Sequence, residues 1–331
     1  MSEKRSDDNQ ETVTIGEDGI DRRGFLECMA WAGTGVLWTL SGGVLSSRSL
    51  AQGTGGSKGE KSNRADLHFV QISDSHIGFK GGANSDVTAT LRATVDRINA
   101  LPVAPAFIIH TGDITQDSTD EQFDTCGSIL QTLKTRDILY VPGEHDVVGD
   151  EGAKYRQRLA KQSHGQGWYS FDRKGVHFIG LVNVLAIKSN GLGTLGAEQL
   201  EWLEKDVKRL KSSTPIVVMA HIPLWSVYPD WGWGTDDGAQ ALAYLKRFGS
   251  VTVLNGHIHQ TLQKVEGNVV FHTACSTAFP KAKPGDMNGP GGLKVEPGRL
   301  QSLLGITQVT YVRGTQPLAI TDTALAPSDT P

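Results

Sequence analysis

The sequence predicts a layered α/β domain with mixed sheets, and three observations support this. Strand-like and helix-like segments alternate in the order β-α-β-α-β through the first half of the chain, and hairpins and further α/β segments follow. Several strand candidates are continuous apolar runs, as expected where both faces of a sheet are covered. The 331 residues are 38% hydrophobic and 21% charged, which is typical of a globular domain with a substantial core.

The N-terminal segment predicts export. Arg22 and Arg23 precede a moderately apolar run, and small residues up to Ala51 fit a signal-peptidase site, so residues 1–51 resemble a twin-arginine signal peptide. Asp21 and Glu27 depart from the usual pattern. A membrane anchor is the alternative, but no run of about 18 uninterrupted apolar residues is present.

Residues 52–64, rich in Gly, Ser and Lys, are then expected to form a flexible linker. We therefore expect a periplasmic or secreted protein that uses the export machinery of the twin-arginine route and keeps no stable membrane span after processing. The formal net charge of −4 shows no basic excess, so nucleic-acid binding is not expected.

The main domain is expected over residues 65–278, with a Pro/Gly-rich loop and late edge strands of the same domain in residues 279–331. The predicted strands cover residues 67–72, 106–109, 138–141, 168–171, 176–184, 216–220, 251–255, 261–265, 269–273, 308–312 and 318–322. Asp172 to Gly175 should form a hairpin turn. Apolar stripes predict helices over 87–98, 123–133, 200–210 and 239–248, and Ser118 with Glu121 would form a capping box for the second.

Two further motifs have alternative explanations. Residues 191–196 match the pattern GxGxxG, but they follow a hairpin instead of opening a β-α-β unit, which disfavours nucleotide binding. Cys126 and Cys275 are interpreted as buried small apolar residues, and whether they pair stays open.

Polar side chains follow five of the predicted strands at the point where each strand ends. Open α/β sheets bind ligands at the carboxyl ends of their strands, so these side chains should converge. A single histidine is more often a core or surface residue, which is our interpretation of His68, His164 and His177. Five of the ten histidines, however, lie at strand ends together with carboxylates. The strand-end residues are Asp74, His76, Asp113, Glu144, His145, Asp146, His221, His257 and His259.

These residues suit metal binding. Carboxylate and imidazole ligands are typical of Mn, Fe or Zn sites, and the lack of paired cysteines argues against an iron-sulfur or structural zinc site. In order and spacing, the blocks resemble those of the calcineurin-like metallophosphoesterases over about residues 65–275. The resemblance implies a four-layer αββα sandwich around two metal ions. It also implies one metal on Asp74, His76 and His259, the other on Glu144, His221 and His257, and Asp113 as a bridge between them.

The resemblance further implies hydrolysis of a phosphate ester by a metal-bridging hydroxide. His145 matches the family's general acid, which protonates the leaving group. Asp146, in the same block, is counted with His145 as a catalytic residue.

Two positions depart from the family pattern. Glu144 stands where Asn is usual, which makes a centre with two divalent cations, three carboxylates and a hydroxide formally neutral. We therefore expect a preference for phosphate diesters over monoesters, or a trivalent iron in one position. The alternative is a catalytically weak or inactive metal-binding protein, or a Glu144 that turns away toward a Lys or Arg. Gln116 stands where many relatives have an Asp, and Asp117 is a candidate substitute.

The surroundings of the site are less specific. The aromatic segment from Trp225 to Gly234 could form a lid over the site or a cover over the sheet, and both interpretations stay open. His272 and the loop over residues 279–299 are expected to shape substrate access.

Overall fold

The computed structural model describes residues 36–41, 44–49, 65–160, 163–314 and 317–326. The chain divides into two compact units, Met1–Lys61 and Ser62–Pro331. Within the first unit, β1 (Val36–Ser41) and β2 (Val44–Ser49) form an antiparallel pair. The predicted linker and most of the predicted signal peptide lie outside the described residues. No helix in the described part of the chain has the length and apolar character needed to cross a membrane.

One sheet of the second unit has five strands in the order β13-β12-β3-β4-β5. The strands β3 (Leu67–Ile72), β4 (Ile108–His110) and β5 (Ile138–Tyr140) are parallel. β12 (Gly305–Tyr311) pairs antiparallel with both β3 and β13 (Ala319–Ala324). The expectation of two late edge strands is therefore wrong for β12, which lies inside the sheet, while β13 is at the edge.

The other sheet has six strands in the order β10-β11-β9-β8-β7-β6. Its four inner strands are parallel, and both outer strands are antiparallel to their neighbours. The strands are β6 (Tyr169–Arg173), β7 (Val176–Gly180), β8 (Ile216–Met219), β9 (Val251–Asn255), β10 (Leu262–Glu266) and β11 (Val269–Thr273). The predicted hairpin joins β6 to β7 through Lys174 and Gly175, which have the positive φ angles of 53° and 82° that tight hairpin turns use.

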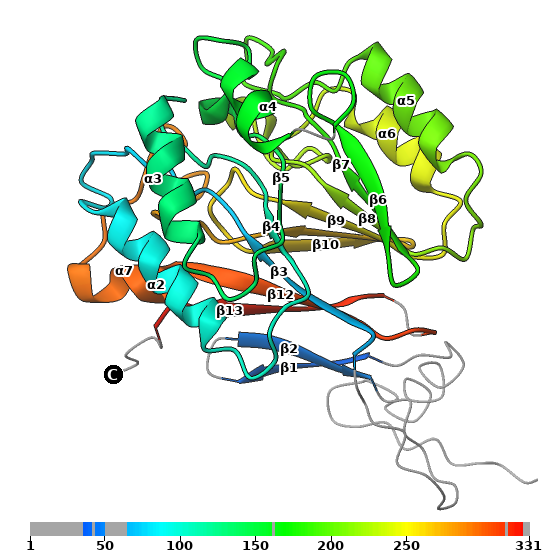
Figure 1. Ribbon diagram of the computed structural model, residues 1–331, viewed down its shortest axis with the longest axis horizontal. Helices are drawn as coiled ribbons and strands as arrows, with labels where there is room; N and C mark the ends of the chain where they lie inside the picture. Colours follow the sequence, from blue (N-terminus) through cyan, green and yellow to red (C-terminus); the bar gives the residue numbers. More distant parts are fainter. Residues whose placement is uncertain (1–35, 42–43, 50–64, 161–162, 315–316, 327–331) are drawn as a thin grey trace, which may run out of the picture. The chain divides into compact units, whose positions relative to one another are not determined.

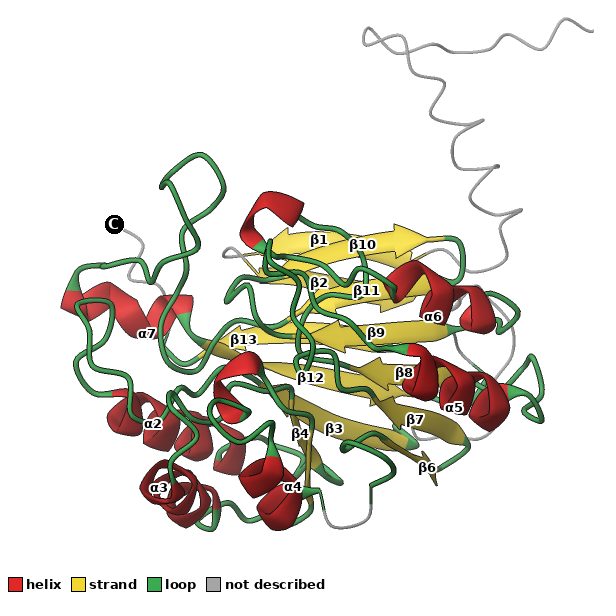
Figure 2. Cartoon of the chain, turned by 90° about the horizontal axis from the view of Figure 1, so that it is seen from above, coloured by secondary structure: helices red, strands yellow, loops and turns green. Residues whose placement is uncertain are grey.

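Helices cover the outer faces of the two sheets (Figures 1 and 2). Side chains of α2 and α3 share a buried cluster with β3 and β4, and side chains of α5 and α6 share another with β7, β8 and β9. The helices are α2 (Val87–Asn99), α3 (Asp120–Leu130), α4 (Ala153–Leu159), α5 (Ala197–Val207), α6 (Gly238–Leu245) and α7 (Leu300–Leu303). Short 3-10 helices η1 (Glu144–Asp146), η2 (Pro229–Trp231) and η3 (Pro297–Arg299) lie in the loops.

A third buried cluster lies between the two sheets. Its centre is aromatic: the rings of Phe69 and Phe107 stack at 4.9 Å, and Phe178 from the other sheet meets Phe69 edge-on at 5.5 Å. The order helix, sheet, sheet, helix confirms the predicted four-layer αββα sandwich with two mixed sheets.

The start of α3 differs from the predicted capping box. Thr119 is the N-cap, and its hydroxyl accepts a hydrogen bond from the backbone nitrogen of Gln122 at 3.3 Å. Ser118 has a φ angle of 53° and donates its hydroxyl to the carbonyl of Asp146 instead. The prediction of a capping box is therefore wrong, because the Ser118 side chain hydrogen-bonds to η1 and not to the start of α3.

Candidate metal centre and active site

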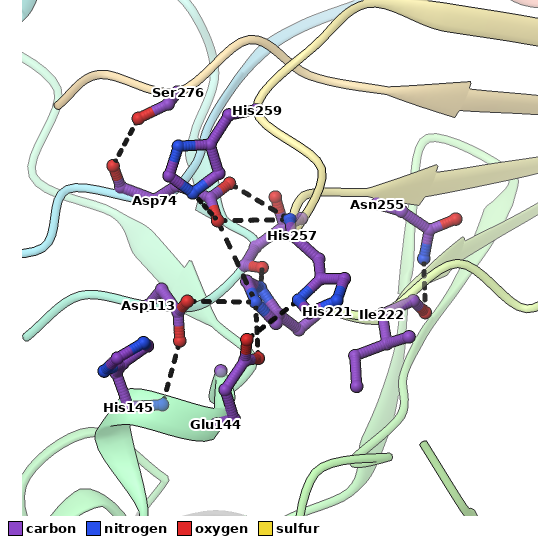
Figure 3. A network of polar contacts seen from close by, with 12 residues as sticks. Asp74, Asp113, Glu144, His145, His221, Ile222, Asn255, His257, His259 and Ser276 are labelled. Carbon is purple, nitrogen blue, oxygen red and sulfur yellow. Dashed lines mark hydrogen bonds and ion pairs between the residues drawn. The ribbon is translucent and has the colours of Figure 1, made fainter. Parts of the chain in front are cut away.

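The carboxyl ends of the parallel strands in both sheets contribute to one cluster of polar side chains (Figure 3). The loops after β3, β4 and β5 come from the five-stranded sheet, and the loops after β8 and β9 come from the six-stranded sheet. The structure therefore brings together, as the sequence predicts, Asp74, His76, Asp113, Glu144, His221, His257 and His259.

The ligand atoms fall into groups that match the two predicted metal positions. Within each group they lie within 4.8 Å of one another, and the groups include Asp74 with His76 and His259, and Glu144 with His221 and His257. Asp113 lies between them, because its Oδ2 is 3.3 Å from His76 Nε2 and 3.3 Å from His221 Nε2. This is the position required of a bridging carboxylate.

Five of these residues have an unusual backbone conformation. Their φ angles are positive although none is glycine, and such left-handed conformations cost about 1–3 kcal/mol each. Backbone strain of this kind persists only where the surrounding structure enforces it, and it concentrates at functional sites. The five residues and angles are Asp74 (56°), His76 (41°), Asp113 (52°), His257 (69°) and His259 (53°).

Three imidazoles are oriented in the same way. In each, Nδ1 lies at hydrogen-bond distance from an oxygen that can only accept, so Nδ1 carries the proton and the Nε2 lone pair is free. These contacts are His76 Nδ1 to Gln116 Oε1 at 3.0 Å, His221 Nδ1 to the Thr111 carbonyl at 2.6 Å and His259 Nδ1 to the Phe279 carbonyl at 2.6 Å.

The residues fit metal ions. His76 Nε2 and His259 Nε2 are only 3.2 Å apart, and two free lone pairs at that distance repel unless a cation lies beside them. Several buried atoms of the cluster also have no hydrogen-bond partner, although buried polar atoms normally have one. They are Asp113 Oδ2, Glu144 Oε2, His221 Nε2, His257 Nδ1 and His257 Nε2.

Glu144 points into the cluster. Its Oε1 is 2.9 Å from His257 Nδ1, and its Oε2 is 2.9 Å from His221 Nε2. The alternative in which Glu144 turns away toward a Lys or Arg is therefore wrong, and both carboxylate oxygens lie where a metal ion could be bound.

His145 lies beside this cluster with one nitrogen free. Its Nδ1 donates to the backbone carbonyl of Gln116 at 2.7 Å, which leaves Nε2 for a substrate. Burial lowers the pKa of His145, but the negative charges of Asp113 and Glu144 outweigh it, so the net shift is upward from 6.5. Asp117 does not replace the usual orienting Asp, because it is exposed and accepts a hydrogen bond from Gln122. The backbone carbonyl of Gln116 orients the His145 ring instead.

Asp146 does not contact the pocket. Its fully buried carboxylate accepts hydrogen bonds from the backbone nitrogens of Ile114, Thr115 and Gly143 and from the Thr115 hydroxyl. The prediction that Asp146 is catalytic is corrected, because its contacts with Ile114 and Thr115 tie the loop after β4 to the loop after β5. Asp146 is a positioning residue for Asp113 and His145.

A cavity of about 300 Å³ opens over the cluster. Its walls combine cluster residues with aromatic side chains and one cation, and the lining includes His76, Glu144, His145, His257, Gln116, Phe79, Phe279, Trp231, Trp233, Lys281, Pro290 and Gly292. Phe279, Lys281, Pro290 and Gly292 belong to the loop predicted to shape access, and the structure places them in the cavity wall. The prediction is wrong for His272, which lies in β11 and pairs with Asp322 at 2.9 Å.

The aromatic segment has both of the roles that the sequence left open. Trp231 and Trp233 line the cavity, whereas Trp225 packs on Phe271 of β11 at 4.8 Å and covers the sheet. Sequence reasoning did not single out Phe79 or Lys281, which both line the cavity. Neither residue belongs to a motif, and Lys281 had only its place in the Pro/Gly-rich loop as a signal.

The remaining motifs contribute no ligand site. The amides of Leu195 and Gly196, at the end of the GxGxxG segment, donate to the Asp237 carboxylate at 2.9 and 2.8 Å. The start of α5 is therefore already occupied by an internal anion. Cys126 is buried, Cys275 is partly exposed, and both are free thiols.

Comparison with known proteins gives relatives that include both phosphodiesterases and purple acid phosphatases. A probable glycerophosphodiester phosphodiesterase, GpdQ, of Arcobacter nitrofigilis is 26% identical over 221 residues, which cover 64% of this chain and 79% of the relative. A 3′,5′-cyclic-nucleotide phosphodiesterase of Nostoc sp., alr5338, is 26% identical over 219 residues, with the same coverage of 64% and 79%.

Solved structures show the same fold at low sequence identity. A dimetal phosphatase from Danio rerio superposes with a TM-score of 0.61 at 15% identity, covering 80% of this chain and 98% of that one. A purple acid phosphatase from yellow lupin gives a TM-score of 0.55 at 13% identity, covering 78% of this chain and 51% of that one.

The calcineurin-like phosphoesterase family matches residues 67–261 of the sequence. All seven residues of the metal-ligand cluster lie within this range, on the strand ends where the structure brings them together. The chain therefore belongs to the calcineurin-like phosphoesterase family.

Proposed function

We propose that this protein is an exported, metal-dependent phosphodiesterase. The observation that carries the proposal is the pair of ligand groups with Asp113 between them, with His145 beside them and a cavity above. Export rests on the resemblance of residues 1–51 to a twin-arginine signal peptide.

The chain's own residues would hold two metal ions in the two groups. Asp74, His76 and His259 form one set of ligands, and Glu144, His221 and His257 form the other. Divalent cations there would polarise the phosphoryl group and lower the pKa of a bound water. Mn, Fe and Zn suit this mixture of carboxylate and imidazole ligands.

His145 would donate a proton to the leaving oxygen of the ester. Its Nδ1 is held by the Gln116 carbonyl, so the second proton of an imidazolium is on Nε2. The backbone nitrogen of His145 also donates to Asp113 Oδ1 at 3.0 Å, which fixes the general acid relative to the bridging carboxylate. Gln116 thereby positions His145 and, through its side chain, His76.

The preference for diesters rests on charge. The Glu144 carboxylate adds a negative charge to the centre, and this penalises a dianionic monoester more than a monoanionic diester. Two of the sequence relatives, named as a glycerophosphodiester and a cyclic-nucleotide phosphodiesterase, support the same choice.

Loading metal-free protein with Mn²⁺, Zn²⁺ or Fe²⁺ tests the proposal. The expected result is two metal ions per chain and a higher kcat/KM for bis(4-nitrophenyl) phosphate than for 4-nitrophenyl phosphate. A clear monoester preference with two divalent ions contradicts the diester assignment. Two bound metals without turnover of diesters, monoesters or nucleotides would instead favour the metal-binding alternative.

A further inference from the structure

Lys281 brings a positive charge to the cavity from outside the family blocks. The family match ends at residue 261, and Lys281 lies in the loop beyond it while lining the same cavity as Glu144 and His145. Its Nζ donates to the backbone carbonyl of His257 at 2.7 Å. Among the residues that the structure describes, no carboxylate forms an ion pair with Lys281, so its charge is not cancelled by a direct partner.

The position of Lys281 is fixed by the loops that carry the ligands. The side chain of Gln260, next to His259, donates to the carbonyls of Lys281 and Ala282 at 3.1 and 2.9 Å. Just before it in the chain, Phe279 accepts the hydrogen bond from His259 Nδ1. The ammonium group is therefore held over the centre in advance, with little side-chain entropy left to lose on binding.

The chemistry of Lys281 complements that of Glu144. Glu144 is an anion without a proton to donate, whereas an ammonium has three N–H donors, and the His257 carbonyl uses one of them. Two donors remain for a ligand.

We infer that Lys281 binds a non-bridging phosphoryl oxygen of the substrate and offsets the negative charge that Glu144 places in the cavity. This inference rests on the proposed function and deepens it, since it names the residue that recognises the phosphoryl group. The ligand chemistry is an oxyanion of phosphorus with at least one free negative oxygen. Uncharged esters would gain nothing from it.

The test is the affinity of metal-loaded protein for inorganic phosphate, measured by calorimetry. Lys281→Gln is expected to raise the Kd about tenfold or more, because a charge-assisted hydrogen bond is lost. Lys281→Arg should stay within about threefold of the wild type, because it keeps both the charge and the donors. The exposed Lys283, two residues along the same loop, provides the control Lys283→Gln, with no change expected.

A second arm connects Lys281 to Glu144. If Lys281 offsets the charge of Glu144, the loss caused by Lys281→Gln should be smaller in a Glu144→Asn background than in the wild type. Metal content of every variant is measured alongside, because Lys281 also contacts the His257 backbone.

The outcomes separate the two proposals. Diester hydrolysis by a Lys281→Gln variant that binds phosphate as tightly as the wild type would overturn the inference and leave the proposed function intact. A Lys281→Gln variant that loses its metal ions would also overturn it, since Lys281 would then only position His257. Phosphate binding that depends on Lys281 in a wild type without diesterase activity would support the inference and contradict the proposed function.

Discussion

Glu144 determines the charge of the centre. It adds a third carboxylate to Asp74 and Asp113 around the same small volume, and both of its oxygens are within 2.9 Å of imidazole nitrogens. Charges this close and this buried interact strongly, because the local dielectric response is weak. One side chain therefore affects which phosphate ester the site favours.

Replacing Glu144 by Asn tests this directly. The change removes one negative charge and adds an amide donor, so we expect the ratio of kcat/KM for monoester over diester to rise by about tenfold or more. The ratio is measured with bis(4-nitrophenyl) phosphate and 4-nitrophenyl phosphate at fixed metal content. The matched control is Glu121→Asn on the exposed side of α3, which should leave the ratio unchanged. An unaltered ratio in Glu144→Asn would refute the charge argument.

The sequence predicts the ligands but not the residues around them. The seven ligands could be found because each follows an apolar strand within a few residues, and strand ends of this kind meet at one edge of a sheet. The roles of Asp146 and Lys281 could not be found, because they depend on hydrogen bonds across 30 residues or on a loop without a motif. The positive φ angles of five ligands also run against local preference.

At the level of elements, close backbone packing lets the loops after the strands bring their side chains together. A side-chain carbon on Gly143 would clash with Oδ1 and the backbone nitrogen of Asp113. The loop after β5 can therefore approach the loop after β4 only if this residue is glycine. Gly256 has a similar role between the loops after β9 and β3, because a side-chain carbon there would clash with the Ser73 hydroxyl.

Gly143→Ala is expected to abolish binding at the bridging position, with loss of at least one metal ion per chain and of hydrolysis. Asp113 is fully buried, so its backbone cannot move away from the new methyl group without displacing its neighbours. Gly127→Ala is the contrasting variant, because Gly127 lies within α3 and a side-chain carbon there meets nothing within 4 Å. It should raise the free energy of unfolding by about 0.5–1 kcal/mol. Elemental analysis and urea unfolding measure the two effects, and full metal content in Gly143→Ala would contradict the packing argument.

The hairpin β6–β7 is tied to α5 by a histidine between two carboxylates. His177 Nδ1 is 3.0 Å from Asp172 Oδ1, and its Nε2 is 2.8 Å from Asp206 Oδ2. Burial alone would lower the pKa of His177, but the hydrogen bonds and charges of Asp206 and Asp172 raise it above 6.5.

This raised pKa makes part of the stability pH-dependent. A group whose pKa is higher in the folded state stabilises the fold fully below its unfolded pKa, and the contribution is lost as pH rises through the folded pKa. The difference in unfolding free energy between the wild type and His177→Gln should therefore be largest near pH 6 and shrink toward pH 9. Urea unfolding at several pH values measures it. A difference that grows with pH would contradict the assignment.

Strand and helix positions were largely predictable, while strand order was not. Continuous apolar runs identify β8 and β9, and period-3.6 stripes identify α2 and α5. The apolar residues of β12 indicate that the strand is at least half buried, but they do not indicate which strands lie beside it. Its place between β3 and β13 follows from antiparallel pairing far along the chain, which local periodicity does not encode.

At the level of the whole molecule, the site joins the two sheets. Asp74, His76, Asp113 and Glu144 follow strands of the five-stranded sheet, whereas His221, His257 and His259 follow strands of the six-stranded sheet. Below the site the sheets are held by the aromatic cluster around Phe69 and Phe178. Metal ions at the edge would add a second connection that exists only in the folded chain.

Metal removal is therefore expected to destabilise the fold as well as to stop hydrolysis. A ligand that binds only the folded state at 100 times its Kd adds about 2.7 kcal/mol, which for a domain of this size corresponds to a Tm difference of about 5–10 °C. Thermal unfolding with and without Mn²⁺ after chelation measures the difference. Asp113→Asn should show a smaller rise in Tm on metal loading, because Asp113 lies between the two ligand groups. Asp117→Asn, a change at an exposed residue, should show the same rise in Tm on metal loading as the wild type. Equal Tm values for metal-free and metal-loaded wild type would show that the sheets hold their arrangement without the metal ions.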